Sequence, residues 1–81
     1  MTLKALKNAN RVIGIKQVAK AVKRDSVQKV FIADDADAVI LKALIHSCAE
    51  QSVELEHVET MKELGTACGI EVGAAAAAIL R

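Results

Sequence analysis

The sequence predicts a single α/β domain spanning residues 1–81, with a four-stranded β-sheet between two layers of helices, a three-layer α/β/α sandwich. Apolar residues alternate along the chain between helical spacing and the continuous or period-2 patterns of strands. The composition, 53% hydrophobic with four Gly and no Pro, is typical of a folded domain rather than of a disordered tail. Because a chain of 81 residues can form only a thin core, short loops and stacked layers are expected.

The first third of the chain predicts a short helix, a strand and a second helix. Thr2 can cap the short helix. Residues 11–13 are rich in β-branched side chains, as in a strand, and are followed by Gly14. From Ile15 to Arg24 the spacing becomes helical. The predicted buried face of this helix consists of Ile15, Val18, Ala19 and Val22.

The middle of the chain predicts a central strand followed by a long helix. Residues 27–33 form an apolar, β-rich segment typical of a buried strand. A helix is expected over residues 38–51, with a buried stripe formed by Leu41, Leu44, Ile45 and Cys48. We interpret Asp34, Asp35 and Asp37 as helix-capping residues, in preference to Mg²⁺ ligands, because acidic groups stabilise a helix N-terminus.

The last third predicts a strand, a helix and a final strand. Residues 53–58 alternate as in a strand, and Thr60 with Glu63 has the spacing of a capping box. The final apolar segment, residues 74–80, is ambiguous because alanine is the best helix former. Its uniform apolarity and the preceding rhythm of helix and strand favour a strand buried on both faces.

The charges are divided unequally between the two parts of the sequence. Residues 1–29 contain eight Lys and Arg against one Asp, whereas residues 30–81 contain three Lys and Arg against nine Asp and Glu. Such asymmetry favours a surface that binds a polyanion. The alternative is that the separated charges only solvate the domain.

The strongest candidate site begins at Gly14, where the predicted strand meets the predicted helix. Glycine allows unusual backbone angles and close approach of a partner, and a helix N-terminus offers free N–H groups to phosphate. Lys16, Lys20 and Lys23 follow i, i+4, i+7 spacing and lie on one side of the helix. Gln17 can donate to and accept from a base edge. A solvated helix face is the competing interpretation.

Other kinds of site are disfavoured. The GxGxxG and GxxxxGK[ST] patterns of nucleotide sites are absent. His46, expected to be solvated, and His57, expected to be packed in its strand, match no metal spacing and have no nucleophile partner. We therefore expect no enzymatic activity, no metal and no cofactor.

Phe31 is the only aromatic residue and lies in a predicted core strand, so base stacking on exposed rings is not expected.

The cysteines and the apolar segments of the sequence indicate where the chain is located and whether it forms oligomers. Cys48 and Cys68 form no CxxC pair, and we interpret them as core residues of a protein in a reducing compartment. The longest apolar segment, residues 73–80, is shorter than the roughly 20 residues that span a membrane. Residues 1–7 lack the apolar core of a secretory signal. We expect a cytosolic chain without membrane contact, and a monomer because no exposed apolar stripe is predicted.

Three segments carry a family signature. Residues 14–21, GIKQVAKA, form a glycine-initiated basic helix start. Residues 64–76, LGTACGIEVGAAA, form a glycine-rich loop followed by a strand, and residues 32–37, IADDAD, form an acidic turn. In this order they resemble the L-seven-Ae family of ribosomal and kink-turn-binding proteins. The resemblance spans nearly the whole chain, and it is greatest to the short bacterial members.

The resemblance implies a mixed four-stranded sheet and binding to kink-turns, which are sharply bent RNA helices with tandem sheared G·A pairs beside a short bulge. The G·A pairs and neighbouring phosphates would be contacted by Gly14, Lys16, Gln17 and Lys20. The loop residues Ile70, Glu71 and Val72 would pack against the bulge, and Asp37 would touch an extruded base.

The sequence departs from the family pattern at four positions. Archaeal and eukaryotic members usually have Asn at the position of Lys16 and Glu at that of Gln17, so we expect more salt-dependent binding here. Gly73 replaces a frequent Pro, which predicts a looser loop before RNA binds. Met61 stands where a Lys is common.

The leading hypothesis is a non-catalytic, ribosome-associated protein that recognises kink-turns. Two alternatives stay open at this point. The chain could bind ribosomal or messenger RNA without a kink-turn, or it could be a protein-interaction module whose acidic half holds a basic partner.

Overall fold

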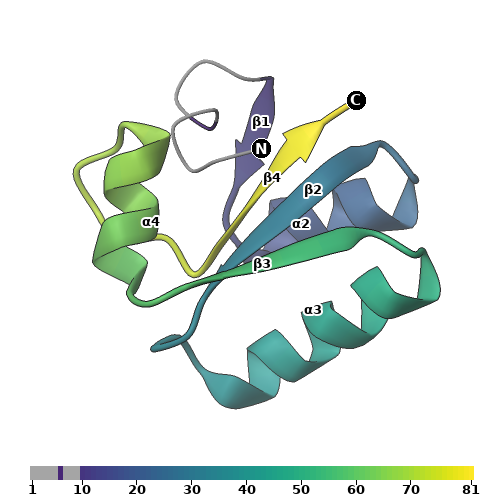
Figure 1. Ribbon diagram of the computed structural model, residues 1–81, viewed down its shortest axis with the longest axis horizontal. Coiled ribbons are helices and arrows are strands. Elements are labelled where there is room, and N and C mark those ends of the chain that lie inside the picture. The colour runs from purple at the N-terminus through teal and green to yellow at the C-terminus, as the bar shows by residue number, and fades with distance from the viewer. Residues whose placement is uncertain (1–5, 7–9) are drawn as a thin grey trace.

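The computed structural model describes residue 6 and residues 10–81, in which helices and strands alternate as the sequence predicts (Figure 1). The elements are β1 (Arg11–Ile13), α2 (Ile15–Lys23), β2 (Val27–Ala33), α3 (Ala38–Glu50), β3 (Glu54–Val58), α4 (Met61–Cys68) and β4 (Ala76–Leu80). The predicted bounds differ from these by a residue or two. Of the short helix predicted after Thr2, only Leu6 is described, and it is buried in the core under α4; the rest lies outside the described residues.

The four strands form one mixed sheet in the order β1-β4-β2-β3. β4 pairs antiparallel with both β1 and β2, placing Ala77 opposite Ile13 and Ala76 opposite Ile32. β2 and β3 are parallel. Therefore β1, β2 and β3 all end at the edge of the sheet where β4 begins, and the loops that follow or precede these strands meet there.

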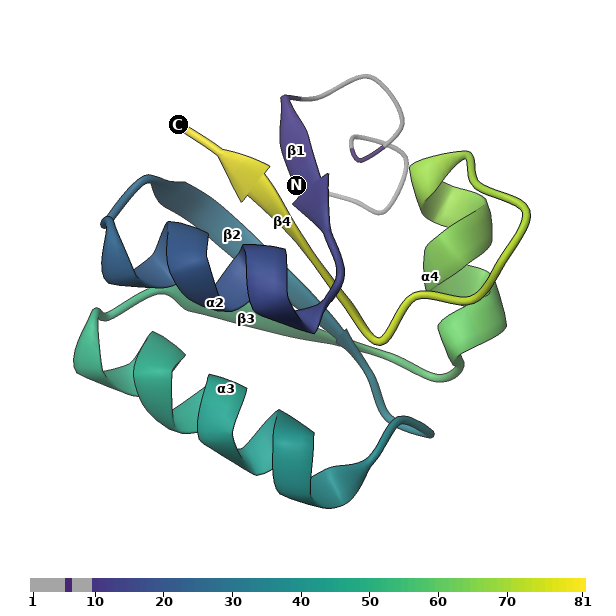
Figure 2. The ribbon, with the colours of Figure 1, turned by 180° about the vertical axis from the view of Figure 1, so that it is seen from behind.

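Helices cover both faces of the sheet, which confirms the predicted three-layer sandwich. α2 and α3 lie on one face and α4 lies on the other (Figures 1 and 2). On the first face, Val18 and Leu41 pack with Val30 of β2. On the second, Leu64 packs with Phe31. Successive side chains of β2 thus point alternately into two hydrophobic cores, one on each side of the sheet.

β4 resolves the ambiguity of the alanine segment in favour of a strand. Ala76, Ala77 and Ala78 are fully buried. Ala76 and Ala78 pack in the core under α2 and α3, whereas Ala77 and Ile79 pack in the core under α4. A central strand covered on both faces tolerates such small side chains, and its hydrogen bonds to two neighbours outweigh the helix propensity of alanine.

The buried stripe of α3 is narrower than predicted. Leu41, Leu44 and Cys48 are buried, but the expectation for Ile45 is wrong, because 37% of that residue is exposed. α3 also exposes Val39 and Ile40, so the expectation of no exposed apolar stripe is not met. The sequence of α3 is apolar around most of its circumference, and periodicity alone could not decide which residues face the sheet. Within the described residues no helix is long and apolar enough to cross a membrane.

Lys29 is the one charged side chain among the buried residues that the structure describes. Its Nζ lies 2.8 Å from Glu56 Oε1 and 3.0 Å from Glu54 Oε2, both on the neighbouring β3. The ammonium also lies 5.2 Å from the centre of the Phe31 ring. Hydrogen bonds and charge from Glu56, then Glu54, raise the pKa of Lys29 despite its burial. One of the eight basic residues of the N-terminal part therefore stabilises the sheet and is not available at the surface.

Cys48 and Cys68 are buried and unbridged, as the sequence predicts. Burial raises the pKa of both thiols, and nearby Arg11 partly opposes this for Cys68. Both therefore behave as apolar core residues and not as reactive thiols.

Candidate nucleic-acid interface

Three segments converge where β4 begins. They are the start of α2, the turn formed by residues 34–37 (the 34–37 turn) and the loop formed by residues 69–75 (the 69–75 loop). The Gly14 N–H donates to Ala76 O at 2.8 Å, and the Ala33 N–H donates to Ala75 O at 2.9 Å. The first bond links the α2 start to the entry of β4, and the second links the end of β2 to the 69–75 loop. The three segments most distinctive in the sequence thus form one continuous edge, visible at the lower end of β4 in Figure 2.

Gly14 makes the abrupt change from β1 into α2. Its φ is +100°, a value that disfavours any residue with a Cβ, and no side chain caps the helix. The N–H groups of Ile15, Lys16 and Gln17 precede the first intrahelical bond, which Val18 donates to Gly14 O at 3.0 Å. No acidic residue lies in the first turn, so the positive end of the helix dipole is not neutralised there.

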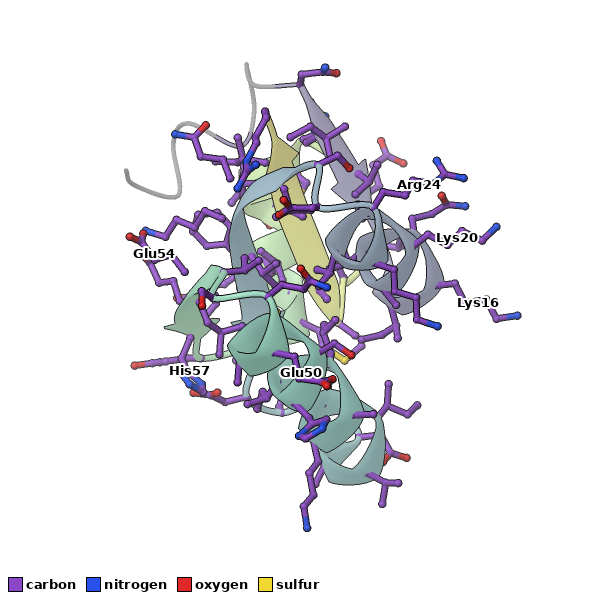
Figure 3. The ribbon with its side chains drawn as sticks, turned by 90° about the vertical axis from the view of Figure 1, so that its right-hand side faces the viewer. Lys16, Lys20, Arg24, Glu50, Glu54 and His57 are labelled. Carbon is purple, nitrogen blue, oxygen red and sulfur yellow. The ribbon has the colours of Figure 1, made fainter. Side chains whose placement is uncertain are left out.

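The exposed face of α2 is basic. Lys16, Gln17, Lys20 and Lys23 are all exposed, whereas Val18, Ala21 and Val22 are buried. Lys16 and Lys20 project from α2 on one side of the molecule, and Glu54 and His57 lie on the opposite side (Figure 3). Arg24, which was not among the residues predicted to contact RNA, extends from the end of the same helix (Figure 3). Four cations therefore follow α2, whose first-turn N–H groups lie at the edge where the three segments meet.

The 69–75 loop leaves α4 through a left-handed glycine. Gly69 has φ +80°; its N–H donates to Thr66 O and the next N–H, that of Ile70, donates to Gly65 O, both at 3.0 Å. This Schellman arrangement satisfies the last carbonyls of the helix. Ile70 is half-buried against the core under α4, while Glu71 and Val72 are exposed, Val72 to 70%. Of the three loop residues predicted to pack on RNA, two are therefore free to do so and one also anchors the loop.

Two glycines let the loop lie directly on α4. A Cβ on Gly65 would stand 2.1 Å from Val72 O, which no real contact allows. A Cβ on Gly73 would stand 3.1 Å from Met61 Cβ. The Ala74 N–H donates to Met61 O at 3.0 Å, which fastens the far end of the loop to the start of α4. Glycine at positions 65 and 73 thus leaves the space in which the Val72 backbone lies against α4.

The aspartates of the 34–37 turn each hold a different element, which corrects the expectation that all three cap α3. Asp37 alone caps that helix, accepting from the N–H of Val39 at 2.9 Å and of Ile40 at 3.4 Å. Asp35 Oδ1 accepts from Met61 N–H at 2.8 Å, at the first residue of α4. Asp34 Oδ1 lies 2.7 Å from His57 Nδ1. The turn thus binds α3, α4 and β3 together, and the described residues include no group of acidic, His or Cys side chains suited to a metal.

The expectation that His57 is packed is wrong, because its side chain is 57% exposed. By alternation it shares the face of Leu55, but it lies near the end of an edge strand, where its side chain contacts Asp34 of the 34–37 turn. His46 is solvated as expected: its side chain is 76% exposed, and its Nε2 lies 3.5 Å from Glu50 Oε1.

An apolar groove between α2 and α3 was not predicted. It encloses about 450 Å³ and is lined by Ile15, Ala19 and Lys23 of α2 and by Val39, Ile40 and Leu44 of α3, among others. The groove exists because α3 exposes apolar residues that the sequence pattern assigned to neither face. Two of its lining residues, Ile15 and Val39, lie next to the start of α2 and to the Asp37 cap of α3.

Comparisons with known proteins agree with this geometry. Residues 1–81 match the family described as ribosomal protein L7Ae/L30e/S12e/Gadd45. A protein of Bacillus pumilus (strain SAFR-032) named RNA-binding protein is 49% identical over 69 residues, 85% of this chain and 84% of that protein. The RNA-binding protein YbxF of Geobacillus stearothermophilus is 44% identical over 78 residues, 96% of this chain and 95% of that protein.

A solved structure extends the likeness to the fold. The 15.5kD RNA binding protein of Giardia lamblia aligns with a TM-score of 0.88 and 28% identity, over 98% of this chain and 70% of that protein. The resemblance inferred from three short segments is thus confirmed over the full length, and so is the similarity to short bacterial members. The chain belongs to the ribosomal protein L7Ae/L30e/S12e/Gadd45 family.

Proposed function

We propose that this chain is a non-catalytic RNA-binding protein that recognises kink-turns. One observation carries the proposal: the basic, uncapped start of α2, the exposed Val72 and Asp37 all lie at one edge of the sheet. A single ligand can therefore meet phosphate-binding and base-contacting groups at once. Relatives that match most of this chain are named RNA-binding proteins.

The proposed contacts divide by chemistry. The N–H groups at the start of α2, with Lys16, Lys20 and Lys23, would bind phosphates, and Gln17 would hydrogen-bond a base edge in a widened groove. Val72, with Glu71 beside it, would pack against bulged nucleotides. The protein would favour the bent state of the RNA by binding it more tightly than the extended state, with no chemical step.

The ribosome and the cytosol are part of the same proposal. The family description names ribosomal proteins, which supports a ribosomal or ribosome-associated RNA as the partner. Free, buried Cys48 and Cys68 agree with a reducing compartment. The monomeric state stays a prediction. It was expected because no exposed apolar stripe was predicted, but α3 does expose apolar residues.

The protein-interaction alternative is less well supported by the geometry. Glu54 and Glu56, two of the nine acidic residues of the C-terminal part, form ion pairs with Lys29 in the sheet. Asp34 pairs with His57, while Asp35 and Asp37 accept backbone hydrogen bonds. Much of the acidic charge thus has structural partners.

The direct experiment is a titration of a short kink-turn RNA, beside the same RNA with its G·A pairs changed to Watson–Crick pairs. Specific recognition predicts tight binding to the first and a loss of roughly 3 kcal/mol, over a hundredfold in affinity, with the second. Equal and strongly salt-dependent affinity for the two RNAs would refute kink-turn specificity and leave the alternative of a general binder of ribosomal RNA.

A further inference from the structure

We propose that Asp35 is a positioning residue that sets the 69–75 loop in the orientation needed for RNA binding. The inference rests on the proposed function, because it assumes that Val72 in this loop contacts the RNA. Asp35 itself touches α4 and is not one of the residues proposed to touch RNA.

A short chain of hydrogen bonds leads from Asp35 to the loop. The Asp35 carboxylate accepts from Met61 N–H at 2.8 Å. Met61 O in turn accepts from Ala74 N–H at 3.0 Å. Met61 also packs against Gly73: a Cβ added at Gly73 would come within 3.1 Å of Met61 Cβ. Met61 is therefore held by Asp35 on one side and holds the end of the loop on the other.

The Asp35 contact differs from an ordinary local cap. α4 already has a local cap, because Thr60 Oγ1 accepts from Glu63 N–H at 3.0 Å. Asp35 comes from 26 positions earlier in the sequence, and it fixes where α4 starts relative to the end of β2. At the other end of α4, Arg11 Nη2 donates to Cys68 O at 2.7 Å. An anion at the N-terminus and a cation at the C-terminus both favour the helix dipole, so α4 is fastened to the sheet at both ends.

The position of α4 determines the position of Val72. The Val72 carbonyl lies against Gly65 in the middle of α4, in a space too small for a Cβ. A shift of α4 therefore moves Val72 with it. Since the 34–37 turn also carries Asp37, Asp35 links two parts of the proposed interface, the turn and the loop, to one another.

The test compares Asp35→Ala with Asp35→Asn and Asp34→Ala. Asn keeps an oxygen that can accept from Met61 N–H but removes the charge. Asp34→Ala removes the same charge from the same turn without touching α4, because Asp34 pairs with His57. All variants are made in the full chain, and circular dichroism verifies that each is folded.

Two measurements decide. Amide hydrogen exchange at Ala74 should be at least tenfold faster in Asp35→Ala, and near the wild-type rate in Asp35→Asn and Asp34→Ala. Affinity for the kink-turn RNA should fall at least tenfold for Asp35→Ala relative to Asp34→Ala. In a Val72→Ala background this difference should largely vanish, whereas in a Lys20→Ala background it should persist, because only Val72 lies in the loop.

Several outcomes would overturn the proposal. Unchanged Ala74 exchange in Asp35→Ala would show that the hydrogen-bond chain does not hold the loop. Failure of Asp35→Asn to restore affinity would assign the effect to charge, and a full effect in the Val72→Ala background would assign it to direct contact. If no kink-turn RNA binds at all, the proposed function fails, while the exchange rates still decide whether Asp35 positions the loop.

Discussion

The exposed side chains of α2 differ in what they offer to RNA. Lys16, Lys20 and Lys23 are mobile point charges suited to phosphate, whereas Gln17 can pair with a base edge. Lysine at position 16 adds charge at the helix N-terminus, where the first turn contains no acidic residue. Affinity for RNA should therefore come mainly from the lysine charges, and specificity should come from Gln17 and from the 69–75 loop.

Replacing Lys20 by Ala should weaken RNA binding roughly tenfold, about 1.4 kcal/mol, because a charged hydrogen bond to phosphate is lost. The slope of log affinity against log salt should become shallower by about one. A salt series of titrations measures both. Arg81→Ala is the matched control, since it removes one positive charge at the far end of β4, where Arg81 lies near Asp25. The same slope for wild type and Lys20→Ala would mean that Lys20 meets no phosphate.

Replacing Val72 by Asp should weaken RNA binding at least tenfold, through charge repulsion and loss of an apolar contact, without unfolding the chain. The residue is 70% exposed, so its side chain contributes little to the core. Thermal unfolding and a titration of each variant separate the two effects. Ile70→Ala, at the half-buried neighbour in the same loop, should instead lower the melting temperature. Unfolding caused by Val72→Asp would place Val72 in the core and contradict its proposed role.

At the scale of the elements, most of the described helices and strands could be predicted from local patterns. Periodicity indicated α2 and α3, β-branched residues indicated β1, and a capping box indicated α4. β4 needed the rhythm of the preceding elements, since alanine alone favours a helix. That the sheet is mixed was implied by the resemblance and not by the sequence pattern, and the order of its strands was not predicted. Partners far apart in sequence could not be predicted, such as Asp35 with Met61 or Lys29 with Glu56. Nor could periodicity place His57, whose side chain is exposed and contacts Asp34 from a turn distant in sequence.

α4 and the 69–75 loop pack as one unit, and Gly65 is the point of closest approach. Gly65→Ala should raise helix propensity yet destabilise the fold by about 1–3 kcal/mol, because the Val72 carbonyl must move away. RNA affinity should fall as well. Urea unfolding with a parallel titration measures the two effects, and Thr66→Ala, at the exposed next position of the helix, serves as the control. Stabilisation with unchanged affinity would show that the loop is not set by this contact.

The β2–β3 pair depends on Lys29, and its stability should respond to alkaline pH. Glu56 and Glu54 raise the pKa of Lys29 in the folded chain. The resulting stabilisation is complete below the ordinary lysine pKa and is lost as pH rises through the raised folded-state pKa. Between about pH 9 and pH 12, the free energy of unfolding should therefore fall more for the wild type than for Lys29→Met. Identical alkaline profiles from urea unfolding would contradict an energetic role for the ion pairs.

At the scale of the whole molecule, the sheet topology gathers the proposed interface. Three strands end and one begins at the same edge, so the α2 start, the 34–37 turn and the 69–75 loop meet although they are far apart in sequence. The basic face of α2 lies on the opposite side from Glu54 and His57 (Figure 3). The cations of α2 thus form a basic face on the side of the molecule away from Glu54, which favours the approach of a polyanion to α2.

The most direct test of this arrangement is a map of backbone amide chemical shifts during titration with a kink-turn RNA. We expect the largest changes at residues 14–20, near Asp37 and at residues 70–73, with little change along β3. Changes concentrated along β3, at Glu54 and Glu56, or spread evenly over the surface would contradict the proposed interface.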